Sequence, residues 1–415
     1  MKKNTISFLM VVHFACLFSQ VAISDVDTIH RNTPTYLQKQ HINYRGNLNN
    51  ARLIFEKEKV GRVAFLGGSI TEMKGWHTMV MEQLKQKFPD TKFDFIEAGI
   101  SSTGTTPGSF RMKKDVFKNG KVDLLFVEAA VNDHTNGFDS IAQIRGMEGE
   151  VRQALFSNPN MDIVMQHFIY DPFIPILNEG KIPDVILNHE KVAQYYQISS
   201  INQAQEIAER MKAGEFDWKQ FGGTHPLPFG HRFYAASLAV LFNKMWSVDT
   251  PTESLLIPHI IPAAPLDDFS YFNGRLVDPH EAKIKNGSWL YENSWIPKEP
   301  AGVRFKNVGI LEALNAKAEL SFDFTGTAIG IYCVCGPNAG IVEYSIDGGE
   351  FKQYDLFTSW SKKLYIPWVH MFATTLKEGK HTIVLRMSAE KNKESIGNAC
   401  QIYYFAVNAV KAKFN

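Results

Sequence analysis

The feature of this sequence that most constrains its fold is a regular alternation of two patterns between residues 60 and 246. Short apolar runs the length of β-strands occur at Val63–Leu66, Phe93–Ile96, Val122–Val127 and Ile163–Phe168. Segments with apolar residues at helical spacing occur at Trp76–Phe88, Ile141–Phe156, Ala193–Met211 with a break near Ser199 and Ser200, and Phe233–Trp246. Strands that alternate with helices predict a parallel sheet covered by helices on both faces, and so a three-layer α/β domain.

The pattern changes at Pro251, where prolines begin to punctuate the chain. Farther on, strand-length apolar runs follow one another at Ala318–Phe324, Ala328–Val334, Ile341–Ile346, Phe351–Leu356 and His381–Met387. The sequence Asp347-Gly348-Gly349 between two of them is typical of a β-hairpin turn. We therefore expect an α/β domain at residues 25–250, a Pro-rich linker at 251–268 and an all-β sandwich domain at 269–415. Because a linker marks a domain boundary, we expect the α/β domain to fold without the sandwich.

The charge balance of the chain excludes some classes of partner. Lysine and arginine together number 44, aspartate and glutamate number 43, and the net charge is +1. Such a chain, without a run of basic residues, predicts no binding to nucleic acid or to an anionic membrane surface. The oligomeric state is left open.

The N-terminus has the pattern of a signal peptide at residues 1–24. Lys2 and Lys3 precede a largely apolar stretch at residues 6–18, and small or polar residues follow before Asp25. The apolar stretch is too short to favour a membrane span, so we expect cleavage rather than membrane insertion. The sequence thus predicts an exported protein, either periplasmic or secreted.

Three cysteines remain after the predicted cleavage, Cys333, Cys335 and Cys400. Cys333 and Cys335 are two residues apart in a strand-like run, so both side chains should point to the same face. Two interpretations stay open: one of them pairs with Cys400, or all three are small buried apolar residues. Without a nearby histidine motif we predict no metal site.

The stretch VAFLGGSITEMKGW, at residues 63–76, places Ser69 directly after an apolar strand and two glycines. One interpretation is structural, because Ser69 and Glu72 have the spacing of a capping box that begins a helix. The other is chemical, because the carboxyl ends of parallel strands are where α/β sheets bind ligands.

Further polar or flexible residues follow the other strands, and together they supply the parts of an acyl-transfer site. Gly99 follows the second strand, Asn132 the third, and His225 precedes the last helix. Histidine can remove the proton of a serine nucleophile. The backbone N–H groups of Ser69 and Gly99, with the side-chain amide of Asn132, would form an oxyanion hole.

This ordered set resembles the SGNH/GDSL family of serine hydrolases over roughly residues 60–246. GGSIT resembles the nucleophile block, the segment around Gly99 the glycine block, AVND the asparagine block and THP the histidine block. The resemblance implies a serine esterase with Ser69 and His225 as catalytic residues, and neither a metal nor an organic cofactor. Exported relatives that carry a β-sandwich resemble polysaccharide deacetylases, which implies an acylated, most simply acetylated, carbohydrate as substrate.

The sequence departs from the family pattern at the acid of the catalytic triad. The family places this acid three residues before the histidine, and that position here is Gly222. Asp217, eight residues before His225, is one candidate for the third member. A backbone carbonyl that orients the histidine is the other, and we favour a Ser69–His225 dyad of this second kind. Asp133 is expected to brace the turn that carries Asn132.

Two other functions remain open at this stage. Glu97, Glu128 and Asp171 near strand ends would suit a glycosidase that uses carboxylates on the same fold. Alternatively, the missing acid would suit a degenerate hydrolase that only binds carbohydrate. Tryptophans of the β-rich region could stack on sugars there, although core packing is the commoner role, at Trp289, Trp295, Trp360 and Trp368.

Overall fold

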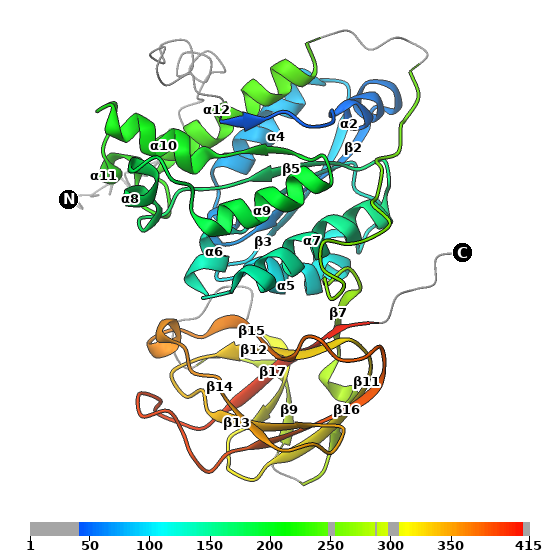
Figure 1. Ribbon diagram of the computed structural model, residues 1–415, viewed down its shortest axis with the longest axis vertical. Coiled ribbons are helices and arrows are strands. Elements are labelled where there is room, and N and C mark those ends of the chain that lie inside the picture. Colours follow the sequence, from blue (N-terminus) through cyan, green and yellow to red (C-terminus); the bar gives the residue numbers. More distant parts are fainter. Residues whose placement is uncertain (1–40, 248–253, 287–288, 298–306, 410–415) are drawn as a thin grey trace, which may run out of the picture.

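The computed structural model describes residues 41–247, 254–286, 289–297 and 307–409. The predicted signal peptide and the first residues of the predicted linker, at 251–253, lie outside this part of the chain. Figure 1 shows a helix-covered sheet formed by the first half of the chain above a β-only domain formed by the second. No helix among the described residues combines the length and apolar character needed to cross a membrane.

A six-stranded sheet lies at the centre of the first domain, in the order β1-β6-β5-β4-β2-β3. Its strands are β1 Ile42–Asn43, β2 Val60–Gly67, β3 Lys92–Gly99, β4 Leu124–Glu128, β5 Asp162–Gln166 and β6 Ser199–Ile201. Strands β2 to β6 run parallel, and β1 pairs antiparallel with β6. The parallel sheet predicted from the alternating pattern is confirmed.

Helices cover both faces of this sheet, as its apolar strands require. The helices are α2 Asn49–Leu53, α3 Ser69–Glu72, α4 Trp76–Lys87, α5 Thr105–Arg111, α6 Ala130–Thr135, α7 Ser140–Ser157, α8 Phe173–Asn178, α9 Asp184–Tyr195, α10 Gln203–Lys212, α11 Trp218–Phe221 and α12 Pro228–Met245. Single π-helical segments extend α2 and α5, at Ile54–Glu58 and Met112–Val116.

Alternate residues of the central strands supply two separate hydrophobic cores. Val63 and Phe65 of β2 belong to the core shared with α4 and α12. Ala64 and Leu66 of the same strand belong to the core on the opposite face, shared with α7 and α9. Because side chains alternate along a strand, one apolar run thus anchors helices on both sides.

The segment Ala193–Met211 differs from its prediction as an interrupted helix. Only its two ends are helical, in α9 and α10, and the break near Ser199 and Ser200 is strand β6. Its three residues, Ser199–Ile201, are buried and pair with β5 and β1. A strand this short carries no visible period in the sequence, so only its partners in the sheet define it.

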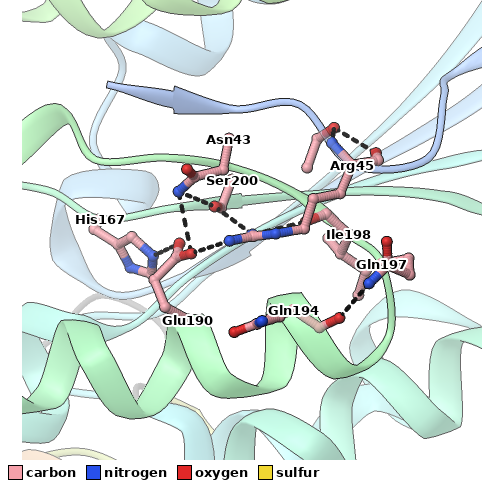
Figure 2. Close-up of polar contacts among 9 residues, drawn as sticks. Asn43, Arg45, His167, Glu190, Gln194, Gln197, Ile198 and Ser200 are labelled. Atoms are coloured by element: carbon pink, nitrogen blue, oxygen red, sulfur yellow. Dashed lines mark hydrogen bonds and ion pairs between the residues drawn. The ribbon is translucent and has the colours of Figure 1, made fainter. Parts of the chain in front are cut away.

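Strand β1 is held at the sheet edge by Arg45, which follows it. Arg45 Nη2 donates to Glu190 Oε2 at 2.7 Å and Nη1 to Ser200 Oγ at 3.0 Å (Figure 2). His167 Nε2 lies 2.8 Å from the other oxygen of Glu190. This network joins the N-terminal segment to α9, to β6 and to His167, the residue that follows β5.

The second domain consists of two antiparallel sheets packed face to face. One has the order β15-β12-β17-β10-β9, with β7 also paired to β17, and the other has the order β14-β13-β16-β11-β8. The strands are β7 Gly274–Val277, β8 Lys283–Ile284, β9 Trp289–Trp295, β10 Val308–Ala313, β11 Glu319–Gly326, β12 Ala328–Cys335, β13 Ile341–Ile346, β14 Lys352–Asp355, β15 Ile366–Ala373, β16 Gly379–Met387 and β17 Cys400–Asn408.

Phe322 of β11 stacks on Phe405 of β17 at 4.1 Å between ring centroids, which joins the two sheets through their shared core. Asp347 and Gly348 both have positive φ, as the predicted hairpin turn between β13 and β14 requires. The all-β sandwich is therefore confirmed.

The described part of the Pro-rich segment, from residue 254, lies bound to the α/β domain. Ile257 exchanges two hydrogen bonds with the side chain of Asn50, and His259 Nε2 lies 2.8 Å from Asp162 Oδ1. Glu148 of α7 then accepts the backbone N–H groups of Leu266 and Asp267. The segment is thus a fixed strap along the first domain.

A hydrophobic cluster also crosses between the two domains. Ile100 and Phe110 of the α/β domain are buried in it, together with Tyr332 and Val369 of the sandwich. Phe110 contacts Tyr271 at 5.0 Å between ring centroids. Lys114 adds a polar contact, because its Nζ donates to Tyr404 Oη at 2.6 Å.

Candidate active site

Ser69 is the first residue of α3, and its hydroxyl is turned toward the loop before α12. Ser69 Oγ lies 2.8 Å from His225 Nε2. The predicted capping box is wrong: Gly68 occupies the N-cap position, and no side chain caps the helix there. Glu72 instead accepts the backbone N–H of Ser101 at 2.6 Å. The serine hydroxyl is therefore free of a capping role and paired with a histidine.

The two glycines before Ser69 are needed because side chains press against the turn. A Cβ atom at Gly67 would lie 2.1 Å from Glu128 Oε1, and one at Gly68 would lie 1.9 Å from Asn132 Oδ1. Neither glycine has a positive φ. The motif thus reflects close approach of the neighbouring groups rather than a left-handed turn.

Glu128, at the end of β4, holds this turn in place through two hydrogen bonds. Its Oε1 accepts the N–H of Gly68 at 2.8 Å and the hydroxyl of Thr71 at 2.6 Å. Burial raises the pKa of Glu128 to about 7, and the hydrogen bonds from Thr71 and Gly68 oppose this rise. Glu128 is buried and bonded to both donors, so it stabilises the turn that carries Ser69. A carboxyl group in this position does not face a sugar, as the acid of a glycosidase would.

Asn132 lies in α6, which follows β4, and its side-chain amide borders Gly68. The amide makes no hydrogen bond among the described residues, although Asn132 is only 9% exposed. Buried amides are normally paired, so a free one beside a serine nucleophile is available to a reacting group.

Asp133 holds the helix of Asn132 in place, which confirms the predicted bracing role. Its Oδ1 accepts the N–H of Thr105 at 2.7 Å. Its Oδ2 accepts the hydroxyl of Thr105 at 2.7 Å and lies 2.9 Å from His189 Nε2. Asp133 and His189 are both fully buried. Helices α5 and α9 are thereby joined to α6 next to the site.

Gly99 is the last residue of β3, and its surroundings explain why it is glycine. A Cβ there would lie 2.3 Å from the backbone nitrogen of Glu72, so α3 crosses directly over this position. The loop that follows also approaches the serine turn, since Thr103 O would lie 3.3 Å from a Cβ at Gly68. The structure brings Ser69, Asn132 and His225 together and places Gly99 against α3.

His225 lies in an exposed turn between α11 and α12. Gly222 and Gly223 have φ values of 107° and 78°, and they turn the chain back after α11. The N–H of Leu227 donates to Phe221 O at 3.0 Å and closes the turn. This loop carries the imidazole from the end of α11 to the hydroxyl of Ser69.

Gly222 occupies the family's acid position for a steric reason. Its left-handed backbone disfavours any side chain, and a Cβ there would lie 2.1 Å from the backbone nitrogen of Leu227. An aspartate at this position would disrupt the turn that presents His225.

Asp217 serves as the N-cap of α11. Its Oδ1 accepts the N–H of Gln220 at 2.7 Å, and the N–H of Asp217 donates to Gln220 Oε1 at 2.8 Å. No hydrogen bond joins Asp217 to His225 among the described residues. The geometry shown is therefore a Ser69–His225 pair, with the proposed third member engaged elsewhere.

Sequence reasoning missed several residues that support the site. The braces formed by Thr71 and Glu128 and by Thr105 and His189 depend on contacts between distant segments. Arg111 was also missed; its Nη2 donates to Gly67 O at 3.1 Å from a fully buried position. The one sequence signal for these contacts is Glu128, a charged residue at the end of an otherwise apolar strand.

Comparison with known proteins adds a fold relationship. No protein-family model and no curated protein matches this sequence. Two solved structures of "a two-domain esterase (CEX) active on acetylated mannans" align along nearly the whole chain. The one co-crystallized with mannopentaose is 19% identical, with a TM-score of 0.70 over 90% of this chain and 98% of that chain. The other is 20% identical, with a TM-score of 0.71 over 89% and 98%.

This chain has the fold of that two-domain protein. The similarity extends through both domains, so the order of an α/β domain and a β-sandwich is shared as well.

Proposed function

We propose that this protein is an exported serine esterase that removes acetyl groups from a polysaccharide, with acetylated mannan as the first substrate to test. The observation that carries the proposal is the 2.8 Å contact between Ser69 Oγ and His225 Nε2 at the carboxyl edge of a parallel sheet. The shared fold with an esterase active on acetylated mannans supports the choice of substrate class.

In the first half-reaction, His225 acts as base and then as acid. Nε2 takes the proton of Ser69 while Oγ attacks the carbonyl carbon of the acetyl ester. The resulting oxyanion accepts hydrogen bonds from the amide of Asn132 and from the backbone N–H of Ser69. The carbon–oxygen bond to the sugar then breaks, and the proton on Nε2 passes to the sugar hydroxyl.

In the second half-reaction, water takes the place of the sugar hydroxyl. His225 Nε2 accepts a proton from the water as its oxygen attacks the acetyl-serine carbonyl. Collapse of the second tetrahedral intermediate breaks the bond to Oγ, and Nε2 returns the proton to Ser69. Acetate leaves, and each step uses groups of the chain and water alone.

The test is an acetate-release assay on acetylated mannan, acetylated xylan and a small activated acetate ester, with wild type and Ser69→Ala in parallel. Ser157→Ala, in α7 and outside the site, is the matched control. We expect release by wild type and the control and none by Ser69→Ala. Failure of wild type to release acetate from every substrate would overturn the proposal.

A carbohydrate-binding protein without turnover is the second candidate, because Asp217 is engaged as a helix cap. Two of the tryptophans predicted to stack on sugars, Trp289 and Trp295, are buried in the sandwich and cannot do so. Trp360 is 55% exposed and remains available. A serine-reactive phosphonate distinguishes the two candidates, since only an activated Ser69 becomes labelled.

A further inference from the structure

Two thiols and an imidazole come together inside the β-sandwich. Cys333 Sγ lies 3.5 Å from Cys335 Sγ, both on β12. Cys335 Sγ lies 3.3 Å from His370 Nε2 on the neighbouring strand β15, 35 residues farther along the chain. The three donor atoms all lie within 4.8 Å of one another. The histidine that the sequence lacked near the cysteines is supplied by strand pairing.

The register of the two strands explains the cluster. Cys333 and Cys335 are two apart on β12, so they share a face, as predicted. Ile331 precedes them on that face and pairs directly with His370. Because paired residues of an antiparallel ladder point to the same side, the imidazole lies diagonally beside the thiols. All three side chains are at most 3% exposed.

We propose that Cys333, Cys335 and His370 bind a Zn²⁺ ion in the core of the sandwich. Zinc bonds of about 2.3 Å to sulfur and 2.0 Å to nitrogen imply tetrahedral edges of roughly 3.5–3.8 Å between the ligand atoms. The distances of 3.5 Å and 3.3 Å fall close to these edges before any ion has drawn the donors around itself.

The charge of the complex selects zinc over a monovalent thiophilic cation. Both thiols lose a proton on binding, so two thiolates, a neutral imidazole and Zn²⁺ sum to zero charge, and two protons leave. A neutral complex is the form that an apolar core accepts at least cost. The half-buried Tyr354, whose ring centroid lies 4.9 Å from that of His370, borders the cluster.

Zinc displaces a proton from each thiol, so protons compete with the metal and zinc affinity should fall as the pH decreases. The bound ion would join β12 to β15, which is the edge strand of its sheet. The site is structural and lies outside the Ser69–His225 pair.

The experiment uses the full chain, kept reduced, stripped of metal and then loaded with Zn²⁺. Metal analysis and native mass spectrometry are applied to wild type, Cys335→Ser, His370→Gln and Cys400→Ala. Cys400 is an equally buried free thiol in the same core and outside the triplet, so its variant is the matched control. We expect one zinc per chain, with two protons lost, in wild type and Cys400→Ala, and at least a tenfold loss of zinc affinity in the other two.

Zinc should also raise the melting temperature of wild type and of the control by several degrees. If the ligand variants fail to fold, wild type loaded with Co²⁺ decides, because two thiolate ligands produce an intense thiolate-to-cobalt absorption band. Wild type without stoichiometric zinc, or equal zinc loss in Cys400→Ala, would overturn the proposal.

Discussion

At the residue scale, three glycines allow the close approaches between backbone and side chains that form the site. Gly67 and Gly68 let Glu128 and Asn132 approach the backbone of the serine turn. Gly222 permits the turn that presents His225 and excludes the family's acid from its usual place. These three glycines thus permit the contact between Ser69 and His225, and Gly222 also leaves the histidine without the family's usual acid.

Replacement of Asn132 by alanine should lower turnover by about 10²–10³ with little change in stability. The amide makes no hydrogen bond with the residues that the structure describes, so its removal breaks none there, while the oxyanion loses a donor. Turnover and melting temperature are measured together. Asn132→Asp, which keeps the size and replaces the donor by an acceptor, should be equally impaired. A large loss of stability with normal turnover would contradict this role.

Asp217→Asn should keep turnover within a few-fold of wild type. Asparagine caps helices about as well as aspartate, so α11 and the His225 loop should be preserved. The variant removes only the negative charge, which the structure shows in contact with Gln220 rather than with the histidine. Steady-state kinetics of Asp217→Asn are compared with those of His225→Ala, which shows how far turnover falls when the base is lost. A loss as deep as that of His225→Ala, in a folded protein, would make Asp217 the third catalytic member.

At the element scale, hydrogen bonds to carboxylates join short helices and strands to their neighbours. Helix α6 is joined to α5 and α9 through Asp133. Strand β1 is fastened to the far edge of the sheet through Arg45 and Glu190 (Figure 2). Both arrangements place a carboxylate where donors from different elements converge, so each carboxylate joins elements that are distant in the sequence.

Glu190→Gln should reduce stability at pH 7, and the difference from wild type should shrink in acid. Burial acts to raise the pKa of Glu190, but a hydrogen bond from His167 and the positive charge of its ring, with hydrogen bonds from Ser200 and Arg45, lower it to about 2. Arg45 also forms an ion pair with Glu190, with 2.7 Å between Nη2 and Oε2.

A carboxylate with a depressed pKa stabilises the fold above its unfolded pKa of about 4.5 and loses this contribution as the pH falls toward 2. The contribution at pH 7 is at most about 3 kcal/mol. Denaturant unfolding of wild type and variant between pH 7 and pH 2 measures it, with Glu179→Gln, an exposed glutamate, as control. A constant difference across this range would contradict the assignment.

At the scale of the whole molecule, the two domains share one hydrophobic cluster. Ile100 begins the loop that approaches Gly68, and it is buried against the sandwich together with Phe110. The strap from residue 254 adds hydrogen bonds to α2, β5 and α7. The sandwich therefore packs against the loop that approaches the serine turn.

Deletion of residues 274–415 should give an α/β domain that aggregates or melts well below the full chain. The deletion exposes Ile100, Phe110 and Tyr271, and it removes the support of the loop near Ser69. Solubility, melting temperature and hydrolysis of a small acetate ester are the measurements. A soluble, equally stable and equally active fragment would instead support the independent folding that the proline-rich sequence predicts.

Much of the architecture was predictable from the sequence. The alternation along Val63–Leu66 and its counterparts predicts the parallel sheet, because burial on both faces demands continuous apolar strands. The order of Ser69, Asn132 and His225 at strand and helix ends likewise predicts one site. These features follow from local periodicity and chain order, which a linear sequence contains in full.

Only the tertiary structure decided which of two local roles each polar residue takes. Ser69 and Glu72 have capping-box spacing, yet the serine hydroxyl meets His225 and the carboxylate meets Ser101. Asp217 has the spacing of a partner for His225, yet its carboxylate caps α11. Cys333 and Cys335 gain an imidazole only through the register of two strands. Hydrogen bonds and metal sites act over about 3 Å in space, and the sequence determines those distances only through the packing of the whole chain.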